Sequence, residues 1–139
     1  MQLTRQTDYA MRAVLYLATS PLASIRQIAE AQSVPQEYLA KILQKLAKEG
    51  IVTTHRGVGG GVSLARAPEK ISMLDVIEAI EGRVALNRCL IHPRECPREK
   101  FCPMHDELDR IGSSLASMFA KVNFARMARD EAAKVGARF

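Results

Sequence analysis

Apolar residues recur at helical spacing in three successive segments of the N-terminal half of the chain. In the first segment they are Ala10, Ala13, Val14, Leu17 and Ala18. Their spacing of three and four residues places them on one helix face, and we expect this helix to end near residues 20–21. A second, short helix begins after Ser24, because Gln27 three residues later completes a capping-box pattern. A third helix is predicted over residues 36–49, with Leu39, Ile42, Leu43 and Leu46 facing inward.

The residues after this third helix change to a β pattern. Gly50 ends the helix, residues 51–54 favour a strand, residues 56–61 a glycine-rich turn, and residues 62–65 a returning strand. Short helices joined by a tight turn and followed by a hairpin are typical of a winged helix-turn-helix. We therefore predict such a domain over residues 1–66, and its third helix is the element that usually enters the major groove of DNA.

The C-terminal half contains a linker helix, a cysteine-rich loop and a long last helix. The linker, residues 67–82, has a helix that starts at Ser72 and ends at Gly82. Residues 83–104 show no periodicity, and a loop of that length indicates either a function or disorder. In the last segment, residues 105–139, one continuous helix is predicted from about residue 103 to residue 134. Its apolar seam is Leu108, Ile111, Leu115, Met118, Val122 and Ala125. The expected fold class is mainly α with a small β-hairpin wing.

Composition indicates a globular protein, and the net charge permits an anionic partner. The 139 residues are 47% hydrophobic and 25% charged, with a net charge of +5. Residues 1–66 hold 8 Lys and Arg against 4 Asp and Glu, whereas residues 67–139 hold 12 against 11, so the N-terminal half is where a polyanion would dock. No apolar run could span a membrane and no signal pattern opens the chain, so we expect a cytoplasmic protein. Nothing resembles a catalytic triad or a phosphate-binding loop, which favours a binding protein over an enzyme.

Side chains that could contact DNA lie on the polar face of the third helix and in the wing. Amide and amine side chains can pair with base edges or phosphates, and the glycines allow the wing backbone to approach a groove closely. An arginine at the start of the wing can lie in a narrow minor groove or on a phosphate. The candidate DNA-binding residues are Gln36, Glu37, Lys41, Gln44, Lys45, Arg56, Gly57, Gly59 and Gly60. A solvated helix face and a merely flexible hairpin are the alternative interpretations.

The three cysteines form the second candidate site. They are Cys89, Cys96 and Cys102, and His105 follows the last of them by three residues. An odd number of cysteines in a chain without a secretion signal favours a metal or redox role over a disulfide framework. Three soft thiolates and an imidazole can complete a four-ligand site. Their spacing leaves a structural zinc site and an iron–sulfur cluster equally open, and a cluster-free redox thiol sensor is a further alternative.

Taken together, these features resemble the Rrf2 family of bacterial winged helix-turn-helix transcription regulators. The resemblance runs through nearly the whole chain and ends with the wing motif of residues 56–61 and the three-cysteine loop. Its helical motifs are Thr7-Asp8-Tyr9-Ala10-x-Arg12, Ile25-x-x-Ile28-Ala29 and Tyr38-Leu39-x-x-Ile42-Leu43-x-x-Leu46-x-x-x-Gly50. The wing and the cysteine loop together are specific to the family, whereas the helix pattern alone is not.

The resemblance implies a regulator, as a rule a repressor, that senses iron, redox or nitric oxide status. It implies a homodimer joined through the last helix, bound to a pseudo-palindromic promoter site in double-stranded DNA, and it favours an iron–sulfur cluster at the cysteines. Two ligand schemes occur in such proteins. One adds the histidine after the third cysteine, here His105, and holds a [2Fe–2S] cluster. The other adds an acidic residue near the N-terminus of the partner subunit, here Asp8, and holds a [4Fe–4S] cluster. The first gap between cysteines is one residue longer than expected for the [2Fe–2S] type.

Overall fold

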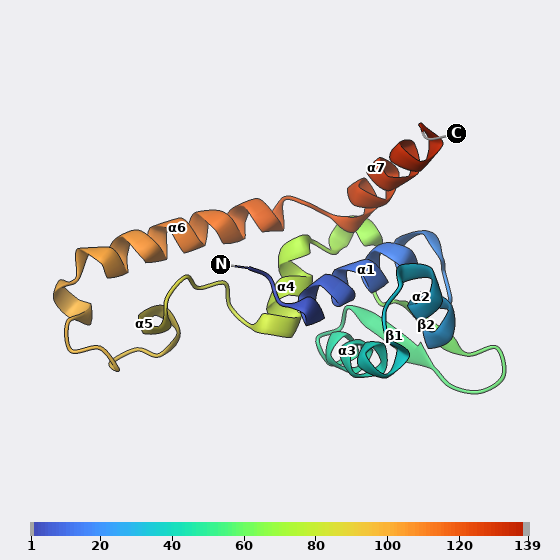
Figure 1. Ribbon diagram of the computed structural model, residues 1–139, viewed down its shortest axis with the longest axis horizontal. Helices are drawn as coiled ribbons and strands as arrows, with labels where there is room; N and C mark the ends of the chain where they lie inside the picture. The colour runs from blue at the N-terminus through green and yellow to red at the C-terminus, as the bar shows by residue number, and fades with distance from the viewer. Residues whose placement is uncertain (1, 138–139) are drawn as a thin grey trace.

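Helices dominate the structure, a computed structural model that describes residues 2–137 (Figure 1). In chain order the elements are α1 (Arg5–Thr19), α2 (Ile25–Gln32), α3 (Gln36–Lys48), β1 (Val52–His55), β2 (Gly61–Leu64), the 3-10 turn η1 (Pro68–Lys70), α4 (Met73–Glu81), α5 (Arg88–Ile91), the 3-10 turn η2 (Glu99–Phe101), α6 (Pro103–Ala120) and α7 (Phe124–Gly136). The two strands form one antiparallel hairpin. The predicted fold class, mainly helical with a hairpin wing, is confirmed.

Local capping signals begin the helices of the winged domain. The Thr4 hydroxyl accepts a hydrogen bond from the Thr7 amide at the start of α1, and Ser24 with Gln27 forms the predicted capping box of α2. Ser33 adopts a left-handed conformation (φ 54°) and lets the chain turn sharply into α3. The apolar faces of these helices meet the hairpin in one core. Its fully buried large side chains include Ile28, Leu39, Ile42, Leu43, Leu46, Ile51, Val62, Ile71 and Phe124.

A carboxylate joins the end of α4 to the start of α1. Glu81 accepts hydrogen bonds from the Thr4 amide, at 2.8 Å, and from the hydroxyl of the fully buried Thr7. Partial burial raises the pKa of Glu81, but the hydrogen bonds from Thr7 and Thr4 lower it further, so the net pKa lies below the usual range. The first residues of the chain are thus held at the point where the cysteine loop leaves α4.

The predicted continuous last helix is wrong, because the chain breaks between α6 and α7. The carbonyl of Val122 accepts a hydrogen bond from the Met73 amide at 2.7 Å, and the Phe124 amide donates to the Ile71 carbonyl at 3.1 Å. The side chain of Asn123 then caps the N-terminus of α7. These bonds satisfy backbone groups that a continuous helix would pair internally.

The break changes which residues share a face. Phe124 is fully buried in the core and α7 lies against α1, so α7 belongs to the winged domain. Val122 and Ala125 therefore do not continue the apolar seam, which ends with α6. On α6 the side chains of Met104, Ile111 and Met118 remain exposed in the single chain.

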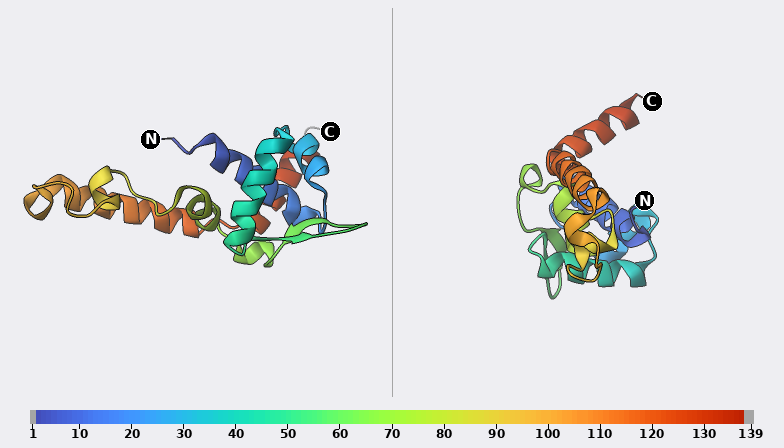
Figure 2. Two further views of the ribbon diagram at one scale, coloured as in Figure 1. Left: turned by 90° about the horizontal axis from the view of Figure 1, so that it is seen from below. Right: turned by 90° about the vertical axis from the view of Figure 1, so that its left-hand side faces the viewer.

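Residues 83–102 are not a featureless loop, since they contain α5 and η2. With α6 they form an arm that projects from the winged domain (Figure 1 and the left view of Figure 2). The arm joins the domain at the C-terminal end of α6, where that helix meets α4. None of the helices within residues 2–137 has the length and apolar character needed to cross a bilayer.

Candidate nucleic-acid interface and metal centre

The α3 helix presents a polar face to solvent along its whole length. Its apolar side chains lie in the core, while all five of its predicted DNA-contacting side chains are exposed. These are Gln36, Glu37, Lys41, Gln44 and Lys45. Lys41 and Lys45 are four residues apart, so they follow one another on the same helix face. An exposed helix face carrying amides and lysines has the chemistry needed to meet base edges and phosphates in a major groove.

The start of α1 adjoins this face, which the sequence did not reveal. The Lys45 ammonium donates a hydrogen bond of 3.1 Å to the Gln6 side chain. Beside it, a hollow of about 300 Å³ is lined by Arg5, Gln6, Tyr9, Pro35 and Tyr38. Arg5 and Gln6 are both exposed, and Tyr38 is 57% exposed. The adjacency is a tertiary contact between segments far apart in the chain, so hydrophobic periodicity carried no signal for it.

The wing is a narrow, exposed turn between β1 and β2. The predicted residues Arg56, Gly57 and Gly59 are exposed, and both glycines have positive φ angles, 93° and 77°. Gly60 closes the turn by donating to the Gly57 carbonyl at 3.0 Å, and a Cβ atom at position 60 would collide with the His55 carbonyl oxygen. The glycines therefore hold a thin loop with Arg56 at its base, a shape suited to lying along a DNA backbone or in a minor groove.

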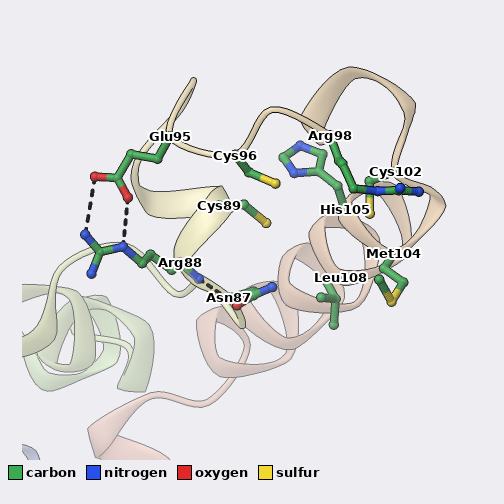
Figure 3. Close-up of a pocket in the computed structure, with 10 residues that line it drawn as sticks. All are labelled: Asn87, Arg88, Cys89, Glu95, Cys96, Arg98, Cys102, Met104, His105 and Leu108. Atoms are coloured by element: carbon green, nitrogen blue, oxygen red, sulfur yellow. Dashed lines mark hydrogen bonds and ion pairs between the residues drawn. The ribbon is translucent and has the colours of Figure 1, made fainter.

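The three cysteines and His105 line one cavity of about 460 Å³ (Figure 3). Cys89 comes from α5, Cys96 from the turn before η2, and Cys102 from the N-cap of α6, one turn before His105. All four residues are half-buried, and the cysteines form no disulfide. In Figure 3 the thiols of Cys89 and Cys96 point toward the same space as the His105 imidazole. The fold thus brings together four of the five predicted ligands.

The donor set fits a soft metal or an iron–sulfur cluster. Among the side-chain atoms that the structure describes, His105 Nδ1 is buried without a hydrogen-bond partner, which is the state of a nitrogen available to a metal. Thiolates and an imidazole are ligands of zinc and of iron–sulfur clusters alike. Within residues 2–137, however, no three His, Cys, Asp or Glu side chains already lie close enough together to hold a single ion. The candidate ligands line one cavity, but they lie too far apart to coordinate a single ion in this arrangement.

Asp8 lies apart from the cavity of its own chain. It sits in the first turn of α1 and pairs with Arg12 at 2.8 Å. Arg12 also donates to the Gln32 carbonyl at the end of α2, at 3.3 Å, and its guanidinium lies 5.8 Å from the centre of the Tyr9 ring. Within one chain, Asp8 therefore serves the contact between α1 and α2, and as a cluster ligand it could act only across a subunit boundary.

Comparison with known proteins identifies the family. The Rrf2 family model, described as an iron-dependent transcriptional regulator, matches residues 3–130. The chain is 39% identical over 95 residues to the HTH-type transcriptional regulator NsrR of Halalkalibacterium halodurans, covering 66% of this chain and 65% of that protein, slightly less than two thirds of its length. It is 32% identical over 115 residues to a putative HTH-type transcriptional regulator of Aquifex aeolicus, covering 80% of each.

Solved structures agree with this assignment. The structure of T. potens IscR superposes with a TM-score of 0.76 at 25% identity, covering 94% of this chain and 88% of that one. CymR of B. subtilis shares the fold, with a TM-score of 0.73 at 20% identity, covering 93% and 97% of the two chains. These relatives are regulators rather than enzymes. The chain therefore belongs to the Rrf2 family of winged helix-turn-helix transcriptional regulators.

Proposed function

We propose that this protein is a repressor whose DNA affinity depends on an iron–sulfur cluster held by Cys89, Cys96, Cys102 and His105. The observation that carries the proposal is the shared cavity, which is lined by three free cysteines and by His105, whose buried Nδ1 has no hydrogen-bond partner. Both [2Fe–2S] and [4Fe–4S] clusters suit thiolate ligands. If the second scheme applies, Asp8 of the partner subunit replaces His105 as the fourth ligand.

DNA recognition is assigned to α3 and the wing. The helix enters the major groove, where Gln36, Glu37 and Gln44 meet base edges, while Lys41 and Lys45 reach bases or phosphates. Arg56 and the glycines at positions 57, 59 and 60 follow the backbone or a minor groove. The positive charge of residues 1–66 supports this placement.

Dimerisation is assigned to α6. The exposed side chains of Met104, Ile111 and Met118 recur every seven residues along that helix, so they form one stripe that a second copy could cover. Two copies joined there would present two α3 helices to the two halves of a pseudo-palindromic site.

The cavity lies beside α6, so a bound group would act on the same helix that joins the subunits. The residues of α5, η2 and the N-terminus of α6 would be fixed relative to one another when their side chains share a group. A difference in dimer geometry between the loaded and empty states is what changes DNA affinity. When bound, the cluster would supply sensitivity to oxidants, nitric oxide or iron supply.

The decisive experiment is the absorption spectrum and metal content of protein purified without oxygen. Visible charge-transfer bands with bound iron and sulfide support the proposal, and their shape separates the two cluster types. Replacing any one of the three cysteines by Ala is expected to remove the chromophore and leave the fold intact. His105→Ala and Asp8→Ala, compared side by side, identify the fourth ligand.

Two other outcomes would replace the proposal. A colourless protein with one bound zinc per chain would make the site structural. A protein free of metal whose DNA affinity changes on thiol oxidation would make it a cluster-free sensor.

A further inference from the structure

Two arginines line the cysteine cavity, and only one of them forms an ion pair with a carboxylate. Arg88 pairs with Glu95 through two hydrogen bonds, of 2.7 and 3.3 Å, and both residues lie at the cavity wall. Arg98 also lines the cavity, but none of the ion pairs or hydrogen bonds formed within residues 2–137 involves its side chain. Arg98 is therefore the cation at the cavity whose charge no carboxylate neutralises.

The negative charge of the three thiolates could be compensated by this arginine. Three thiolates carry more negative charge than a divalent cation can neutralise, so a metal bound to all three leaves a net negative group. Burying such charge is unfavourable unless a cation compensates it. In Figure 3 the Arg98 guanidinium is drawn beside Cys102, on the side away from Cys89 and Cys96 and opposite the Arg88–Glu95 pair, and the residue is exposed to solvent.

We propose that Arg98 is the counter-cation of the cysteine-ligated group, so that it strengthens metal binding and favours the more reduced state of a bound cluster. The inference rests on the proposed metal site. It assigns no ligand role to Arg98, which acts through its charge on the ligand set. A reduced cluster carries one more negative charge than an oxidised one, so a neighbouring cation stabilises the reduced form more strongly.

The chain offers a matched control. Lys100 lies two residues further along the same loop and is exposed like Arg98, but it is absent from the cavity wall. Lys100→Gln removes the same charge from the loop as Arg98→Gln, so the difference between the two variants isolates the position of the charge. Arg98→Lys keeps the charge and loses the planar fork, and Arg98→Glu reverses the charge.

The test begins with Co²⁺ titration of the reduced, metal-free protein, followed through thiolate-to-cobalt charge-transfer bands. We expect Arg98→Gln to weaken Co²⁺ binding roughly fivefold, as for one partly solvated charge near the site, and Arg98→Glu to weaken it further. Arg98→Lys should keep most of the affinity, and Lys100→Gln should differ little from the unaltered protein. Circular dichroism of each metal-free variant checks that the fold is retained.

A second measurement uses the cluster-loaded protein. Titrated with dithionite as the one-electron reductant, Arg98→Gln should show a lower midpoint reduction potential than Lys100→Gln. Equal effects of Arg98→Gln and Lys100→Gln on both readouts would overturn the inference while leaving the metal site in place. Loss of affinity in Arg98→Lys as large as in Arg98→Gln would also overturn it, because the charge would then be irrelevant. Absence of thiolate–cobalt bands in the unaltered protein would instead refute the metal site itself.

Discussion

Phe124 anchors the turn that separates α6 from α7, and replacing it tests why the last helix breaks. The side chain is fully buried, and a phenylalanine in that state removes roughly 200 Å² from water. At about 25 cal/mol per Å² its burial contributes ~5 kcal/mol. Alanine keeps part of that area but leaves a cavity, so Phe124→Ala should lower the free energy of unfolding by about 3–5 kcal/mol.

The assay is urea unfolding followed by far-ultraviolet circular dichroism at one fixed protein concentration, because the proposed subunit association would also contribute to apparent stability. Phe101→Ala is the control, since Phe101 is 82% exposed in the arm and should change stability by less than about 0.5 kcal/mol. If Phe124→Ala does not unfold the protein completely, α7 should become sensitive to proteolysis first. A loss of less than about 1 kcal/mol in Phe124→Ala would refute the reasoning, because a residue in a solvent-exposed continuous helix would behave that way.

Three further predictions concern DNA affinity and pH. Lys41→Ala and Lys45→Ala should each weaken binding to all DNA sequences alike and reduce the slope of log affinity against log salt by about one unit, as measured by fluorescence anisotropy. Arg26→Ala is the control, because Arg26 lies on the exposed side of α2 and pairs with Glu30. It should leave the slope unchanged. Arg5→Ala should reduce the same slope if the start of α1 contacts a phosphate, and an unchanged slope would restrict the interface to α3 and the wing. Because the pKa of Glu81 is lowered in the folded state, its contribution to stability is present above the ordinary pKa of 4.5 and is lost as pH falls through the folded value. Glu81→Gln should therefore be less stable than the unaltered protein near pH 7, by less than ~1.4 kcal/mol because the carboxylate is exposed. In strong acid the two proteins should be equally stable. A stability difference that grows toward low pH would contradict the lowered pKa of Glu81.

Local signals in the sequence predicted what depends on neighbours in the chain. The capping box at Ser24 needs only Gln27, and the stop at Gly50 needs only its own positive φ of 72°, so both were predicted correctly. The four candidate ligands lie within seventeen residues of one another, so a single segment carries them to the one cavity that they line; their role as ligands stays a prediction.

Contacts between segments far apart in the chain could not be predicted from the sequence pattern. The seam on the last helix continues through Val122 by spacing alone, but the Val122 carbonyl is bonded to Met73, some fifty residues earlier in the chain. The hydrogen bond from Lys45 to Gln6 likewise joins residues 39 positions apart. Periodicity reports which face of a helix is apolar, and it contains no information on which other segment will satisfy a backbone group or a side chain.

The attachment of α6 at one end makes the arm a lever. With 18 residues the helix is about 27 Å long, so a rotation of roughly 10° at its joint with α4 moves the far end by about 5 Å. The same rotation, read from the far end, swings the winged domain and its α3 through a comparable arc. In the proposed dimer, two α3 helices would meet DNA half-sites about one helical turn, roughly 34 Å, apart, and a shift of a few ångströms in their spacing would misalign them. The hydrogen bonds that tie residues 122–124 to residues 71–73 lie at this joint. In the proposed regulator, their stiffness would determine how much of a movement at the cysteines reaches α3.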